Sequence, residues 1–326
     1  MNRFLRRVIV AMLLGVLVYG VAVLYAGINT MRESLATFAW WTFAAALALA
    51  STNYVLRFLK WQYYLGRLGI SGIKPLDSFL VFLSGFVLTV TPGKVGEVFK
   101  SAVLAKTHGV AAARTAPIVV AERLTDAIGV IVLIVIGSAA YAGGLEWAIA
   151  GAFAVTLGLL FIVWERPVRA IIAALEKRPG KLGELAPKLA EAYGSLRIVA
   201  GPAALLWPTF LSILGWGCEG FALFLLLRGF HQEVPLGVAV FFYATATLAG
   251  ALVPVPGGLG VAEAMIQEQL VRLGGVAQGA ATASMILIRF ATLWWAVLVG
   301  FAALFALRVR FGAALSEVSA AAPEEA

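Results

Sequence analysis

The chain has 326 residues, of which 62% are hydrophobic and 13% are charged, and its formal net charge is +8. A soluble domain carries about 25% charged residues, so this composition excludes a soluble protein and predicts an integral membrane protein. The single cysteine, Cys218, excludes an intramolecular disulfide, and two histidines are too few for a histidine-rich metal site and leave little for a catalytic triad.

Eight apolar runs follow one another along the chain, most of them near the length of about 20 residues that spans a bilayer as a helix. They lie at about 8–27, 39–59, 76–91, 115–136, 147–164, 203–227, 236–255 and 281–306. The first run follows three arginines, as in a signal peptide, but it is long and no small-x-small cleavage site follows it. We therefore interpret it as a retained helix. The predicted fold class is an all-α polytopic membrane protein.

Basic residues between the apolar runs set the predicted orientation, because cytoplasmic loops collect lysine and arginine. They gather before the first run, in the linker 165–200 and, as Arg308 and Arg310, after the last run. Both termini and the linker are therefore predicted to be cytoplasmic, with the linker on the anionic leaflet, and this placement argues against a nucleic-acid partner. When the spans between these basic segments are counted, the third run must enter and leave the membrane on the cytoplasmic side, and the seventh run must do so on the outer side. We predict about six spanning helices plus two oppositely oriented re-entrant helical hairpins, near 76–105 and 236–271.

The two hairpins divide the chain into two predicted halves. The expected segments are a first transmembrane helix with an external loop (1–38), a first repeat (39–164), a cytoplasmic amphipathic linker (165–202), a second repeat (203–311) and a disordered cytoplasmic tail (312–326). The halves share one pattern, formed by Pro92, Gly93, Gly96 and Glu97 in the first and by Pro256, Gly257, Gly260 and Glu263 in the second. We interpret the pattern as an inverted repeat, the build of many transporters, with chance recurrence in a glycine-rich chain as the alternative.

Each break in the pattern is predicted to be followed by a helix that restarts, over about 95–104 and 260–270. A restarting helix presents unpaired N–H groups and a partial positive charge, which favour an anion such as phosphate, and Lys94 adds a full charge. The candidate substrate-binding residues are Pro92, Gly93, Lys94, Gly96, Arg123, Pro256, Gly257, Gly258, Gly260 and Arg289. The alternative is that Glu97 and Glu263 are themselves the anions and act only as first-turn caps.

The other charges inside apolar runs need partners or a hydrated cavity, because an unpaired charge at the bilayer centre costs about 2.5–3.5 kcal/mol. Glu122 and Asp126 are four residues apart on one helical face, and a surface position is the alternative for Glu122 and Arg123. Arg289 is the expected partner of Glu263. The candidates for charge balance or for carrying a coupling proton are Glu97, Glu122, Asp126, Glu219 and Glu263.

The stretch 57–69 mixes basic and aromatic residues where the second run returns to the cytoplasm. The simpler interpretation is an aromatic belt at the membrane interface. The sharper one is a gate of Arg57, Lys60 and Trp61 that contacts lipid headgroups.

Four motifs carry a resemblance to a known family. They are Arg57-x-x-Lys60-Trp61, Thr91-Pro92-Gly93-Lys94-x-Gly96-Glu97, Glu122-Arg123-x-x-Asp126 and Pro256-Gly257-Gly258-x-Gly260-x-x-Glu263. As a set they resemble the transmembrane region of lysylphosphatidylglycerol synthases over nearly the whole chain. The resemblance implies a flippase-like domain, which in the bacterial multiple peptide resistance factor moves aminoacylated phospholipid across the membrane. The soluble synthase domain is missing from this sequence, so no lysyl transfer is implied.

We therefore expect a lipid flippase or transporter of the cell inner membrane that moves an anionic phospholipid or lipid-linked phosphate between leaflets, with a proton as the candidate coupling ion. Two alternatives remain open: a transporter of a small soluble anion, and a non-transporting partner of a lipid-modifying or glycosyl-transferring enzyme. Enzyme activity is not expected, because the sequence contains no recognisable nucleophile–base pair or cluster of metal ligands. The expected partners are a membrane lipid as substrate and a lipid-modifying enzyme, and no cofactor or metal is expected.

Overall fold

The computed structural model describes residues 28–91, 95–138, 145–178 and 181–312, together with positions 15, 17, 19–21, 23 and 24 of the first apolar run. Within these residues the protein is all-helical and has no strand. Three of the described helical segments are long and apolar enough to cross a membrane: α3 (Trp41–Arg67), α11 (Pro202–Gly229) and the continuous segment Gln278–Phe311. The chain is a multi-pass membrane protein, as its composition predicts. The tail beyond Gly312 lies outside the described residues.

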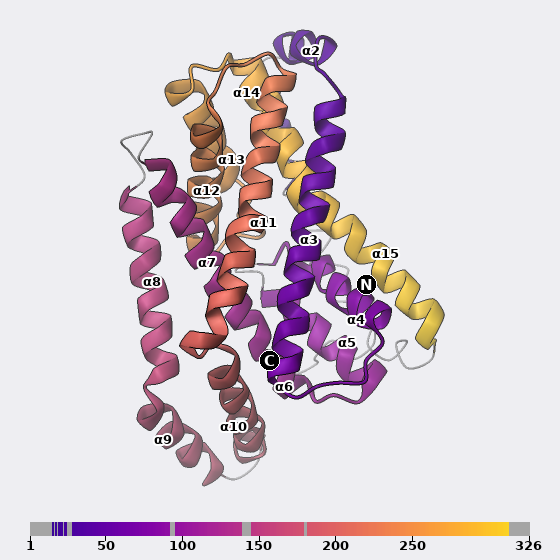
Figure 1. Cartoon of the computed structure of the whole chain (residues 1–326), viewed down its shortest axis with the longest axis vertical. Coiled ribbons are helices and arrows are strands. Elements are labelled where there is room, and N and C mark those ends of the chain that lie inside the picture. The colour runs from indigo at the N-terminus through magenta and orange to yellow at the C-terminus, as the bar shows by residue number, and fades with distance from the viewer. Residues whose placement is uncertain are drawn as a thin grey trace.

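The first half contains one long helix followed by a broken pair of shorter ones (Figure 1). After α2 (Ile28–Ala36) and α3, its elements are α4 (Pro75–Ser84), the 3₁₀ turns η1 (Gly85–Leu88) and η2 (Val95–Val98), α5 (Phe99–His108), α6 (Ala112–Thr115) and α7 (Pro117–Ser138). The helix predicted to restart after the first break is therefore a 3₁₀ turn that leads into α5. Residues 92–94, which form the break itself, lie outside the described residues.

The second half repeats this order of elements. Its elements are α11, α12 (Leu236–Leu252), α13 (Val261–Glu268) with the π turn η3 (Gln269–Leu273), and α14 (Gln278–Arg289), which continues through the π turn η4 (Phe290–Trp294) into α15 (Trp295–Phe311). Between the halves lie α8 (Leu145–Val163), α9 (Glu165–Glu176) and α10 (Lys181–Val199). Figure 1 shows α8 at the edge of the bundle and the α9–α10 pair at one end of the molecule.

The second break follows from its prolines and glycines. Helix α12 ends at Leu252, and Val253 is extended because the residue before Pro254 is driven out of the helical region. Gly257, Gly258 and Gly260 all have positive φ, between 61° and 86°, which residues with a side chain rarely adopt. Helix α13 then begins at Val261, so the predicted restart is confirmed.

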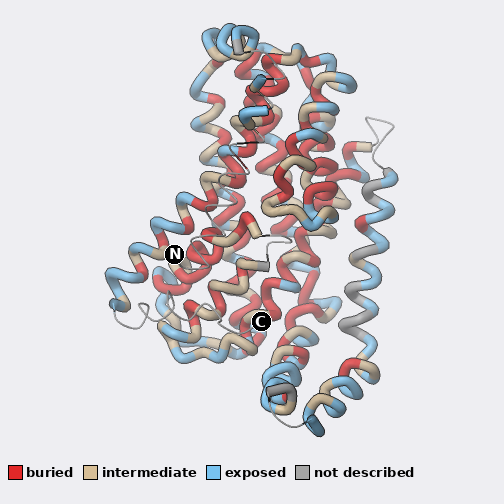
Figure 2. The backbone as a smooth tube through the Cα atoms, turned by 180° about the vertical axis from the view of Figure 1, so that it is seen from behind, coloured by how far each residue is buried: buried red, intermediate tan, exposed pale blue. Residues whose placement is uncertain are grey.

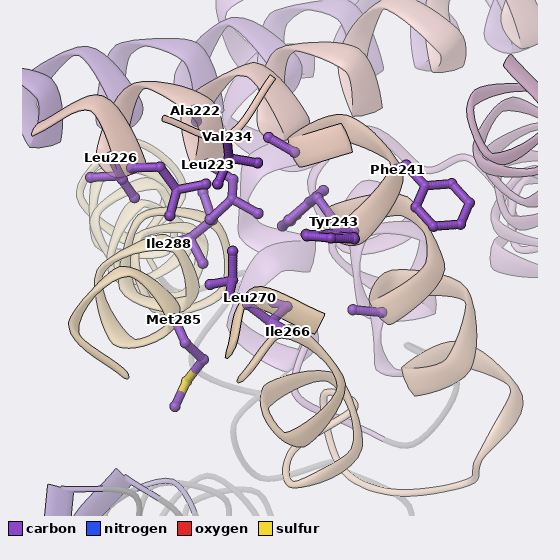
Figure 3. Close-up of a cluster of buried hydrophobic side chains, with 14 of the residues drawn as sticks. Ala222, Leu223, Leu226, Val234, Phe241, Tyr243, Ile266, Leu270, Met285 and Ile288 are labelled. Carbon is purple, nitrogen blue, oxygen red and sulfur yellow. The ribbon is translucent and has the colours of Figure 1, made fainter. Parts of the chain in front are cut away.

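Each hairpin is embedded in its own apolar cluster. The larger cluster surrounds α12 and α13, where Leu223, Leu270 and Ile288 come together from α11, η3 and α14 (Figure 3). The second cluster surrounds α4 and α5 and includes Trp61 and Phe82. Figure 2 shows these buried positions in red along the middle of the bundle.

A third, smaller cluster joins the residue before the first break to the second break. Val90, just before the first break, packs with Leu259, just after the glycines of the second, and with Leu293 of η4. The approach is close: a Cβ atom built on Gly257 would lie 3.5 Å from the Cα atom of Val90. Residues that flank the first break therefore lie directly against the second break.

Candidate functional site

A cavity of about 430 Å³ lies beside the second break. Its wall includes Thr89 and Thr91, just before the first break, and Gly257 and Gly258 from the second. The charged side chains that line it come from four different helices and are Arg57, Arg123, Asp126, Glu219 and Arg289. Five charges from separate parts of the sequence therefore share one cavity.

Glu97 accepts hydrogen bonds from three side chains of the first half. Its Oε2 atom accepts hydrogen bonds from Arg57 Nη2 of α3 at 2.9 Å and from Arg123 Nη2 of α7 at 3.1 Å. Its Oε1 atom accepts a hydrogen bond from Thr89 at 3.1 Å. Glu97 is buried, so its charge is compensated by these two arginines and not by water.

Glu263 combines the two interpretations made from the sequence. Its Oε1 atom pairs with Arg289 Nε at 2.6 Å, so the predicted ion pair is confirmed. Its Oε2 atom also accepts the N–H of Gly260 at 2.7 Å, which caps the first turn of α13. Arg289 Nη2 in turn donates to the backbone oxygen of Gly257 at 2.7 Å.

Both halves use the same spacing for this contact. The arginine lies 26 residues after the glutamate in the pair Glu97–Arg123 and again in the pair Glu263–Arg289. In each half the glutamate belongs to the first turn after the break, and the arginine belongs to the following long helix. The spacing strengthens the argument that the halves are related.

A second set of ion pairs in the first half involves two buried lysines, Lys60 and Lys100. Lys60 Nζ of α3 pairs with Asp126 Oδ1 at 2.7 Å and donates to Ser212 Oγ of α11, which donates to the same carboxylate oxygen at 3.0 Å. Lys100 Nζ pairs with Glu122 at 2.6 Å. Arg123 also contacts Asp126, through its Nη2 atom at 3.1 Å.

These contacts correct two expectations about the cytoplasmic end of the helices. Lys60 and Trp61 are fully buried, so neither belongs to an interfacial belt or a headgroup gate. Lysine was expected at the surface because its charge favours water, but the carboxylate of Asp126 holds it inside. Glu122 is buried as well, so a surface position is wrong for it, whereas the side chain of Arg123 is 24% exposed. Arg57 is buried and lines the cavity.

The backbone N–H groups of the restarts are engaged by side chains. Gly96 N–H donates to the hydroxyl of Thr91 at 2.7 Å, and Gly260 N–H donates to Glu263. The expectation that these two N–H groups would bind an anion is therefore wrong, because the chain supplies its own acceptors. Pro256 lies at the second break but is not among the residues of the cavity wall, and Pro92, Gly93 and Lys94 lie outside the described residues.

Unpartnered donors remain on two of the cavity arginines. The Nε atoms of Arg57 and Arg123 are buried and have no hydrogen-bond partner in the part of the chain that the structure describes. An unsatisfied buried donor costs about 1–3 kcal/mol, and more when the group is charged. An anion in the cavity would remove that cost.

A family model matches residues 12–300 of the chain. The chain belongs to the family described as the lysylphosphatidylglycerol synthase TM region. All four motifs that carried the resemblance lie inside the matched residues, so the resemblance is confirmed. No curated protein matches the chain.

Two neutral residues beside the candidate site, Asn53 and Tyr243, were not predicted from the sequence. Glu219 accepts hydrogen bonds from Asn53 Nδ2 and from Tyr243 Oη, both at 2.5 Å. Asn53 lies four residues before Arg57 and seven before Lys60 on α3, so the three share one helical face. Polar residues at this spacing within an apolar run indicate a polar helical face, and that signal could have predicted Asn53 as part of the site.

A second cavity, of about 650 Å³, lies between α9 and α10. It is lined by Arg169 and Arg197, which both pair with Glu165. None of its lining residues belongs to either break, so it is not part of the candidate site.

Proposed function

We propose that the protein is a lipid transporter that moves an anionic phospholipid or lipid-linked phosphate between membrane leaflets, and that it is not an enzyme. The observation that carries this proposal is the meeting of Arg57, Arg123 and Arg289 at one cavity between two broken hairpins. Membership of a family of lipid-related membrane proteins supports it.

The chemistry of the three side chains favours a phosphate. A guanidinium group is planar and carries five N–H donors, a geometry that matches the oxygens of a phosphate better than a lysine does. The Nε donors of Arg57 and Arg123 have no partner among the described residues, so each arginine can offer a phosphate an additional hydrogen bond when it turns away from Glu97. In a cavity of low dielectric constant, such charge-assisted bonds are stronger than they are in water.

The proposed architecture has about six spanning helices and two re-entrant hairpins that enter from opposite faces, with both termini in the cytoplasm. The order of elements shared by the halves and the repeated Glu–Arg spacing support an inverted repeat. The ion pairs support a charge-balancing role for Glu97, Glu122, Asp126 and Glu263, and a coupling proton remains a proposal for this set and for Glu219.

Reconstitution tests the proposal directly. The purified protein is placed in liposomes with fluorescent phosphatidylglycerol, and a membrane-impermeant quencher reports how much of the lipid has changed leaflet. Arg57→Gln should slow the movement roughly 10- to 150-fold, because one charged hydrogen bond is worth about 1.5–3 kcal/mol. The matched control is Arg272→Gln, which removes an exposed arginine of η3 that pairs with Glu268 of α13. Equal rates in wild type and Arg57→Gln would contradict the proposal.

A further inference from the structure

The wall of the central cavity is divided into a polar and an apolar part. The charged and hydroxyl-bearing side chains come from α3, α11, α14, η4 and the residues before the first break, and also from one face each of α7 and α12. The apolar part, which we call the apolar trough, is formed by α7, α8 and α12 through Val120, Leu124, Ala127, Val155, Leu248 and Leu252. We propose that the apolar trough holds a hydrocarbon chain of the lipid whose phosphate lies at the arginines. This inference rests on the proposed function and names the part of the substrate that a soluble anion lacks.

Helix α7 joins the two parts of the wall. Val120, Leu124 and Ala127 are four and three residues apart, so they line one face of the helix. Arg123 and Asp126 lie one residue before Leu124 and Ala127 and also line the cavity. The apolar trough therefore begins within one helical turn of the charged site, as it must if one molecule occupies both.

The apolar trough reaches the surface of the bundle. Val120 is 45% exposed and Leu252 is 39% exposed, although both line the cavity. Helix α8 lies at the edge of the bundle (Figure 1), and its side chains Phe153 and Leu157 are exposed and apolar. In a membrane-spanning protein, a surface of this kind faces hydrocarbon, so the rim of the trough opens to lipid chains.

Gly151 closes the trough on one side. A Cβ atom built on Gly151 would lie 2.9 Å from a methyl group of Leu248 and 3.1 Å from one of Ile131, so α8 touches α12 and α7 at this residue. The trough is therefore limited at Gly151 and extends past Val155 toward Val120 and Leu252. A chain lying there stays in apolar surroundings while its headgroup contacts charge, which spares it the cost of entering a polar cavity.

Photochemical labelling of the full chain in lipid nanodiscs tests the inference. The probe is phosphatidylglycerol with a diazirine on one acyl chain, and the control probe is diacylglycerol with the same chain and no phosphate. After irradiation, peptide mass spectrometry should find the phosphate-bearing probe on Ala127, Val155 and Leu248, and diacylglycerol only on the outer face of α8. Val155→Trp should lower labelling of the trough to the level seen with diacylglycerol, whereas the outer-face control Leu157→Trp should leave it unchanged.

The outcomes separate this inference from the proposed function. Labelling confined to the outer face of α8, or equal labelling of the trough by both probes, overturns the inference even if lipid movement still depends on Arg57. Labelling of the trough by the phosphate-bearing probe, in a protein that moves no fluorescent lipid, supports the inference and contradicts the proposed transport. If Val155→Trp misfolds, the comparison of the two probes on the wild-type chain still decides the question.

Discussion

In the second half of the molecule, Arg289 binds one carboxylate, that of Glu263, and the backbone oxygen of Gly257. In the first half, Arg57 and Arg123 bind the same oxygen of Glu97. Arg289 thus joins α14 to the second break and to the helix that follows it, while Arg57 and Arg123 connect α3 and α7 to η2 through side chains. In the second half, the arginine is bound to a backbone oxygen of the break as well as to a carboxylate. In the first half, two arginines share one carboxylate, so either can leave it while the other stays bound.

The shared carboxylate has a physical consequence for the first half. Glu97 keeps one cation when either arginine moves to a phosphate, so the cost of an uncompensated buried charge does not arise. Glu263 has a single arginine among its described contacts and would bear that cost in full. We therefore expect the first half to exchange partners and the second to act as the fixed support.

The largest effect is expected from labelling that tests the opposite orientation of the two hairpins. In a Cys218→Ala background, Lys74→Cys and Ala111→Cys flank the first hairpin, and Glu233→Cys and Arg272→Cys flank the second. A membrane-impermeant maleimide applied to intact cells should label the second pair and leave the first unlabelled until the cells are opened. If residues 74 and 111 react from opposite sides of the membrane, the first segment is a spanning helix and the two halves do not contain oppositely oriented hairpins.

Removing the second-half arginine should cost the most stability. Arg289→Ala leaves Glu263 buried without its cation, which destabilises a protein by about 3–5 kcal/mol. Thermal unfolding followed by size exclusion measures the loss, and Arg272→Gln, at an exposed pair, should stay within about 0.5 kcal/mol of wild type. The double variant Arg289→Gln with Glu263→Gln should recover part of the loss. A stable Arg289→Ala protein would show that the pair does not support the fold.

Single removals in the first half should cost less than this. Arg57→Gln removes one charged hydrogen bond, about 1.5–3 kcal/mol, and leaves Arg123 on Glu97. Arg123→Gln removes one such bond together with the ion pair to Asp126, and leaves Arg57 on Glu97. The double variant should lose more than the sum of the two, because Glu97 is then deprived of both. Simple additivity in a double-mutant cycle on thermal unfolding would contradict the idea of a shared carboxylate.

The smallest effect is expected at Glu219. Tyr243→Phe deletes the hydrogen bond to Oε2 and leaves Asn53 on Oε1, so we expect a loss of about 1.5 kcal/mol in thermal unfolding, the low end of the range for a bond to a charged group. Tyr63→Phe is the matched control and should change stability by less than about 0.5 kcal/mol. A loss as large as that of Arg289→Ala would mean that Glu219, and not Glu263, is the main support of the second half.

Much of the second half could be predicted because its signals are local. The prolines and glycines mark the end of α12 and the start of α13, and hydropathy marks α11. The pair Glu263–Arg289 followed from two charges in otherwise apolar surroundings, which left each with few partners.

The first-half network could not be predicted because its partners are distant in sequence. Lys60 meets Ser212 across 152 residues, and Asn53 meets Glu219 across 166 residues. Periodicity indicates the face of α3 that carries these groups but not which helix packs on it. The mixture of basic and aromatic residues around Lys60 is typical of an interface, and only the packing of α3 on α7 and α11 places it inside.

The π turn η4 begins at the residue after Arg289, inside the longest apolar segment of the described chain. Such a turn holds one residue more than an ordinary helical turn, which corresponds to about 100° of rotation. The indoles that follow it reach different neighbours: Trp294 donates to Tyr19 of the first apolar run, and Trp295 donates to Ser51 of α3. Two hydrogen bonds to different helices therefore set the rotation of α15 directly after the residue that pairs with Glu263.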